Sequence, residues 1–124
     1  MSVLDKYPLM LIHNDNSEEL YSNALILAKK AADVLKKKYS ASKVVLFGSL
    51  LDENSFGTTS DIDLAVLGIP DNKFYDAVGT IIQVVTPFEV DLVDISDCRE
   101  SIKKSIENEG VELWQTDILL LSVK

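Results

Sequence analysis

Two aspartates inside an apolar run constrain this chain more than any other feature. The segment SDIDLAVL carries Asp61 and Asp63 two residues apart and then becomes continuously apolar. Such an alternation is typical of a β-strand, in which residues two apart point to the same face with Cα atoms about 6.6 Å apart. Neighbouring carboxylates repel each other unless a cation or solvent accepts their charge. The pattern therefore predicts either a metal-binding strand or an edge strand with one polar, solvated face.

Two further segments favour the metal-binding interpretation. Gly48 and Ser49 directly follow the apolar run of residues 43–47, and Asp91 lies in a later apolar run, FEVDLVDI. Glycine lets backbone N–H groups approach an anion, and the serine hydroxyl adds a donor. Carboxylates from two strands can hold one hard cation, or two cations about 3.5–4 Å apart. Asp94 falls on the opposite strand face from Asp91, so we expect it to be a surface acid outside the metal site.

Length and charge limit the classes of protein that remain. The 124 residues fit one domain, spanning residues 1–124, with one core. A net charge of −8 argues against direct nucleic-acid binding, although not against a nucleotide held through a divalent metal. No apolar run approaches the roughly 20 residues that cross a bilayer, and the N-terminus lacks the pattern of an export signal. We expect a cytoplasmic protein that does not contact membranes.

Periodicity and turn residues predict the order helix, strand, strand, helix, strand, helix, strand. The first helix starts at Asn16 and Ser17 and ends in a lysine run that suits the negative end of a helix. We expect Asp71 and Asp97 to cap the second and third helices. This order indicates an α/β (α+β) protein with a small mixed β-sheet packed against helices. The predicted strands are residues 43–47, 61–67, 88–95 and 111–114, with residues 118–123 as a further segment.

The order of these motifs resembles the polymerase-β-like nucleotidyltransferase superfamily, and most of all its minimal nucleotidyltransferases from bacteria and archaea. Their motif runs hGSxARGxxxxxSDhDhhh, where h is apolar, and a third aspartate follows on a later strand. The resemblance covers roughly residues 17–115 and implies the nucleotidyltransferase fold. The matching positions are Phe47, Gly48, Ser49, Ser60, Asp61, Ile62, Asp63 and Leu64, with Asp91 as the third acid.

The resemblance also implies roles for these residues. Asp61, Asp63 and Asp91 would be the catalytic residues and would hold two Mg²⁺ ions on a nucleoside triphosphate such as ATP. Asp91 would also help to deprotonate the incoming hydroxyl. The reaction would transfer a nucleoside monophosphate to an acceptor, with pyrophosphate leaving. The implied nucleotide-binding positions are Gly48, Ser49 and Ser60.

The chain departs from the family motif beside the glycine. Where the family often has Ala-Arg-Gly, this sequence has Leu51-Asp52-Glu53, and the loop from Ser49 to Asp61 is one residue longer. An arginine there would neutralise phosphate charge, whereas two acids repel a triphosphate unless they point away. Lys43 and Lys73 are candidate substitutes. The departure makes catalytic activity a separate question from the fold.

The minimal proteins of this family resemble antitoxins that pair with an all-helical HEPN-domain ribonuclease and can adenylylate it. The leading hypothesis is therefore a Mg²⁺-dependent antitoxin that moves AMP from ATP to a hydroxyl of its HEPN-type toxin partner. One alternative is a weak or inactive antitoxin that neutralises the partner by binding alone. Another is a nucleotidyltransferase that acts on a small molecule. The nucleobase, the acceptor and the choice between a homo- and a hetero-oligomer stay open.

Overall fold

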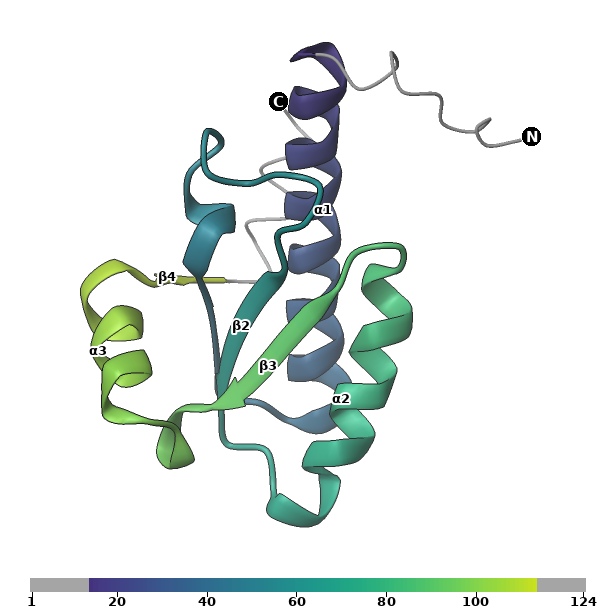
Figure 1. Ribbon diagram of the computed structural model, residues 1–124. Coiled ribbons are helices and arrows are strands. Elements are labelled where there is room, and N and C mark those ends of the chain that lie inside the picture. Colours follow the sequence, from purple (N-terminus) through teal and green to yellow (C-terminus); the bar gives the residue numbers. More distant parts are fainter. Residues whose placement is uncertain (1–13, 114–124) are drawn as a thin grey trace.

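A computed structural model of the chain describes residues 14–113 (Figure 1). It confirms the predicted order of helices and strands and the α+β class. Short 3₁₀ turns, η2 and η3, follow β1 and β3. The elements are α1 (Asn14–Tyr39), β1 (Lys43–Phe47), η2 (Gly48–Leu51), β2 (Ile62–Leu67), α2 (Asp71–Val85), β3 (Val90–Asp94), η3 (Ile95–Asp97), α3 (Glu100–Glu109) and β4 (Val111–Glu112).

The strands form one mixed sheet in the order β3-β2-β1-β4. β1 runs antiparallel to both β2 and β4, whereas β2 and β3 are parallel. Parallel strands need a crossover, because a tight turn can only join antiparallel neighbours. Here α2 provides that crossover between β2 and β3. The mixed sheet predicted from the sequence is therefore confirmed.

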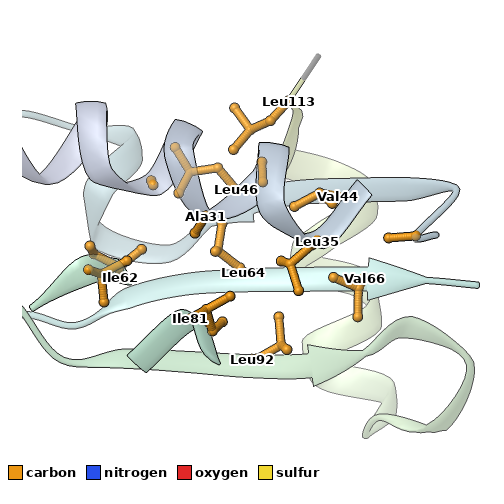
Figure 2. Packing of buried hydrophobic residues seen from close by; sticks show 14 of the residues in the cluster. Ala31, Leu35, Val44, Leu46, Ile62, Leu64, Val66, Ile81, Leu92 and Leu113 are labelled. Carbon is orange, nitrogen blue, oxygen red and sulfur yellow. The ribbon is translucent and has the colours of Figure 1, made fainter. Parts of the chain in front are cut away.

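Helices cover both faces of the sheet, with α1 and α2 on one side and α3 on the other (Figure 1). The strand period of two divides the side chains of β2 between these faces. Ile62, Leu64 and Val66 are fully buried against α1 and α2, and Figure 2 shows them facing Leu35 and Ile81. Ala65 points the other way and joins a smaller cluster made with Val45, Phe47 and Ile106. None of the helices between residues 14 and 113 combines the length and the hydropathy that a membrane-spanning segment requires.

The ends of several elements differ from the sequence prediction. α1 begins at Asn14 instead of Asn16, because consecutive polar residues offer several possible helix starts. Asp71 is the first residue of α2 and not its cap, which is Pro70. Asp97 lies within η3, and Arg99 precedes α3 without a side-chain cap. The reason for the last difference is local: the Ser96 N–H donates to Asp94 Oδ1 at 2.9 Å and starts η3. Trp114 and residues 118–123 lie outside the described residues.

The lysine run at the end of α1 contributes to the fold. The Lys36 ammonium donates a hydrogen bond to the Leu113 carbonyl oxygen at 2.6 Å, which ties α1 to the chain after β4. Lys37 pairs with Asp33 one turn earlier, with 3.5 Å between the charged atoms. Lys38 lies 5.6 Å from the centre of its neighbour's ring, that of Tyr39. These contacts agree with the interpretation of the run as a helix end.

The Tyr39 hydroxyl provides a polar link between α1 and α2, and its removal should lower stability. It donates to Asp76 Oδ2 at 2.5 Å and lies 2.7 Å from Thr80 Oγ1, while Tyr39 itself is only 5% exposed. We expect Tyr39→Phe to reduce the free energy of unfolding, measured in urea, by about 1–2 kcal/mol. Tyr75→Phe is the control, since Tyr75 is 84% exposed and should change stability by less than about 0.5 kcal/mol. Equal stabilities of the two variants would contradict the assignment.

Candidate active site

The parallel ladder between β2 and β3 brings two of the predicted site residues side by side. Asp63 is the register partner of Asp91, and neighbouring strands lie about 4.8 Å apart. Both point to the sheet face that carries Ala65 and Val93, the face covered by α3. Asp63 is half-buried, whereas Asp91 is exposed. Asp61 is also exposed and lies immediately before β2, which starts at Ile62.

Burial and neighbouring charges make the Asp63 carboxyl hard to ionise. Its pKa is raised from 3.8 to about 6, first because burial removes the carboxylate from water and then because of the negative charges of Asp91 and Asp61. All three aspartates are therefore close enough to interact electrostatically. A group in this environment favours a proton or a cation beside it.

The Gly-Ser turn after β1 lies directly against Asp63. Phe47, the last residue of β1, is the register partner of Asp63. Gly48 then turns the chain with a φ of +80°, a region that side chains with a Cβ rarely adopt. A Cβ at Gly48 would overlap Asp63 Oδ2 and lie 3.0 Å from Asp63 Cγ. The predicted phosphate-binding turn and the predicted metal-binding acid are therefore neighbours, and only glycine allows this approach.

The remaining residues of the motif form their own local hydrogen bonds. The Gly57 N–H donates to Ser60 Oγ at 3.0 Å, so the serine hydroxyl closes its loop. Ser49 is half-buried in η2, and its carbonyl oxygen accepts from the Asp52 N–H at 3.2 Å. The Ser60 contact agrees with an interpretation in which serine bonds local backbone.

Asp52, which replaces the family arginine, holds a turn together. Its Oδ1 accepts from the Asn54 N–H at 3.1 Å, and its Oδ2 accepts from the Ser55 hydroxyl at 3.0 Å. Both carboxylate oxygens are therefore engaged within the loop. The sequence contained the signal for this turn, an aspartate followed by Asn and Ser, which favours local side-chain-to-backbone bonds. The composition of residues 50–60 predicts a loop that contains Asp52, and the structure adds that the Asp52 carboxylate accepts both of these bonds.

The structure places the two lysines proposed as substitutes for the arginine at the other end of the sheet. Lys43 pairs with Leu67, whereas Phe47 pairs with Asp63, so Lys43 is four residues, or about 13 Å, along the strand from the aspartate. Lys73 is in the first turn of α2 and lines a cavity together with Lys38. Neither position allows contact with a phosphate beside Gly48.

Two of the predicted metal ligands, Asp63 and Asp91, form a carboxylate pair that suits Mg²⁺. In the part of the chain from residue 14 to 113, no three His, Cys, Asp or Glu side chains lie in a metal-holding arrangement. The joint role of Asp61, Asp63 and Asp91 as metal ligands therefore stays a prediction. Mg²⁺, however, commonly binds through one or two carboxylates plus water and substrate phosphates. The paired carboxylates of Asp63 and Asp91 are oxygen donors of that kind.

Comparisons with known proteins agree with this geometry. Residues 29–119 match the family described as polymerase beta, nucleotidyltransferase. The chain is also similar to one in a crystal structure of a toxin–antitoxin with AMP-PNP, with 24% identity, 77% of this chain and 81% of that chain covered, and a TM-score of 0.58. A second similar structure is the tri-AMPylated Shewanella oneidensis HEPN toxin in complex with MNT antitoxin, with 18% identity, coverage of 80% and 86%, and a TM-score of 0.55. At these identities the likeness shows the fold. No curated protein sequence matches the chain.

Substitution of Gly48 should be costly for a reason specific to this turn. Gly48→Ala forces a Cβ into a positive-φ residue and against the Asp63 carboxylate. We expect a loss of more than about 1 kcal/mol in the free energy of unfolding, measured in urea. Gly57→Ala is the matched control, because a Cβ there meets nothing within 4 Å. If Gly48→Ala is tolerated as well as Gly57→Ala, the close approach of the turn to Asp63 is wrong.

Stability should depend on pH through Asp63. The pKa of Asp63 is higher in the folded protein than its ordinary value. With respect to this carboxyl, the free energy of unfolding is therefore greatest below pH 3.8 and falls as pH rises through about 6. In metal-free protein, Asp63→Asn should therefore raise stability by about 1–2 kcal/mol above pH 7, after discounting for partial exposure. This gain should shrink to near zero at about pH 4. Thermal unfolding with chelator across this range measures it, and Glu109→Gln on exposed α3 surface should show no such trend. A loss of stability above pH 7 would instead identify Asp63 as a structural hydrogen-bonding residue.

Proposed function

Because this chain belongs to the polymerase-β nucleotidyltransferase family, we propose that it transfers AMP from ATP to a hydroxyl of a partner protein, in a reaction that depends on Mg²⁺. The partner we propose is a helical toxin of the HEPN type, for which this chain is the antitoxin. The observation that carries the proposal is the arrangement of Asp63 beside Asp91, with the Gly48 turn against them.

The similar solved structures support the choice of partner and nucleotide. Those structures are toxin–antitoxin pairs, one of them with AMP-PNP and one with an AMPylated HEPN toxin. The present chain covers about four-fifths of the matched chains, so the similarity extends over most of their length.

In the proposed mechanism, Asp61, Asp63 and Asp91 would hold the Mg²⁺. When bound, Mg²⁺ would neutralise phosphate charge and stabilise the leaving pyrophosphate. The Gly48 turn would let the backbone approach the phosphates, because no Cβ intervenes. Asp91, exposed on β3, would accept the proton of the incoming hydroxyl. A bond forms between the hydroxyl oxygen and the α-phosphorus, and the bond from that phosphorus to pyrophosphate breaks.

One observation favours a second function, neutralisation of the partner by binding alone. Asp52 and Glu53 are both exposed in the loop that follows the Gly48 turn, and the whole chain carries a charge of −8. These charges oppose the approach of a triphosphate that has no metal. They do not oppose binding to a basic protein surface. Measurements of nucleotide binding and of transfer separate the two functions.

Nucleotide binding should require the metal. Calorimetry with ATP should detect binding by the wild-type chain in the presence of Mg²⁺ and little or none with chelator, because the site and the triphosphate are both negative. Asp63→Asn should weaken the Mg²⁺-dependent binding, and Glu109→Gln should not. Equal affinity with and without Mg²⁺ would contradict the metal-dependent mechanism. Absence of binding in both conditions would favour the pure binding function.

Transfer itself is tested with a HEPN-type toxin protein of the kind proposed here as the partner. Incubation of the two proteins with ATP and Mg²⁺ should add about 329 Da per AMP to the partner, as intact-mass spectrometry would show. Asp61→Asn should abolish the added mass while the complex, followed by size-exclusion chromatography, persists. If Asp61→Asn still protects cells from the toxin as well as wild type does, binding alone neutralises it. Modification of a small metabolite instead of the protein would overturn the choice of acceptor and leave only the family assignment.

A further inference from the structure

A cavity of about 450 Å³ lies beside the second half of β3, between the first turn of α2 and the segment that leads into α3. Its volume falls within the range of sites that bind small ligands, roughly 300–1,000 Å³. Nothing in the proposed chemistry at Gly48 and Asp63 uses it. The apolar part of its wall is formed by Phe74, Tyr75, Leu92, Val93, Cys98 and Ile102.

The charges around this cavity are mainly negative. Asp71, Asp94 and Asp97 line it together with a single cation, Arg99. One oxygen of Asp94 accepts from the Ser96 N–H and hydroxyl, but Asp71 and Asp97 are exposed. Among the described residues, no ion pair joins Arg99 to any of these carboxylates. The excess of carboxylates favours a cationic occupant over a neutral or anionic one.

An exposed aromatic ring at the same cavity adds a second reason for a cation. Tyr75 is 84% exposed, and its ring meets that of Phe74 edge-on, with 5.8 Å between centroids and an interplanar angle of 82°. Aromatic faces attract guanidinium and ammonium groups, and apolar walls accept the alkyl stem that carries such a group. An arginine or lysine side chain combines both parts.

The cavity adjoins the strand that carries Asp91, although its α2 wall lies toward the opposite end of that strand. Val93 lines it and is two residues from Asp91 on the same face of β3, a distance of about 6.6 Å between Cα atoms. An extended segment of the acceptor that placed a basic side chain in the cavity and ran along β3 toward Val90 would reach Asp91 within a few residues of that side chain.

From the cavity, its charges, its exposed ring and its distance from Asp91, we propose that this pocket docks an arginine or lysine side chain of the acceptor protein and so positions the acceptor hydroxyl. The inference rests on the proposed transferase function, because it assigns the pocket to the acceptor of that reaction. It identifies the acceptor as a protein whose modified hydroxyl lies near a basic residue.

The test is a titration of the whole ¹⁵N-labelled chain with Nα-acetyl-arginine methylamide, followed by NMR. We expect saturable shifts of the backbone amides around Tyr75, Cys98 and Arg99. The citrulline analogue, which has nearly the same shape without the charge, should give much smaller shifts. Tyr75→Ala should weaken the arginine affinity about threefold to fivefold, the range for an exposed cation–π contact. Ile82→Ala, which removes another exposed apolar side chain of α2, should leave the affinity unchanged.

Three results would overturn the inference. They are the absence of saturable shifts with the arginine probe, equal binding of arginine and citrulline probes, and an Ile82→Ala effect as large as that of Tyr75→Ala. These failures are distinct from failure of the proposed function, which appears as absence of Mg²⁺-dependent ATP binding by the wild-type chain. Binding of the arginine probe without ATP binding would keep the pocket as a docking site and remove its catalytic purpose.

Discussion

The register of β2 is the constraint on which the rest of the structure depends. Its side chains alternate between a core shared with α1 and α2 and a second face covered by α3. Ile62, Leu64 and Val66 are fully buried on the first face, and Asp63 lies on the second. A slip by one residue would exchange the two sets and place a carboxylate among the apolar side chains of the larger core. The burial of three aliphatic residues therefore fixes the position of Asp63. The ionised carboxylate is destabilised in that position, as its raised pKa indicates.

Much of this arrangement was predictable from local patterns. The acid–apolar alternation at Asp63 indicated a strand, and the acid at the same phase of a later strand indicated a partner. The Gly48–Ser49 pair marked the end of β1, and the structure adds that the glycine must accommodate Asp63 itself. These features were predictable because each depends on a period of two or on a single turn. The order of the elements followed from the same patterns.

The features that sequence reasoning missed depend on contacts between distant segments. The sequence could not exclude Lys43 from the site, whereas the register of β1 and β2 pairs it with Leu67, away from Asp63. The bond from Tyr39 to Asp76 joins two helices whose relative position no local pattern specifies. The sequence predicts Asp97 as a helix cap, but Asp94 caps the 3₁₀ turn η3 and Asp97 lies within that turn. The cavity beside β3 is formed by residues of α2, β3 and α3 that are distant in the sequence, so no local motif predicts it.

Because β3 lies at the edge of the sheet, its aspartates also affect how one molecule associates with another. β3 has β2 on one side and no strand on the other in the sheet formed by the described residues. An edge strand rich in Val and Leu is a template for pairing with a second chain, and charged side chains on it discourage that pairing. Asp91 and Asp94 interrupt the apolar sequence of β3 in this way. The carboxylate of Asp91, proposed above to take part in the chemistry, thus also helps to keep the edge strand from pairing with another copy. We therefore expect a variant that neutralises Asp91 to aggregate more readily, apart from any effect on activity.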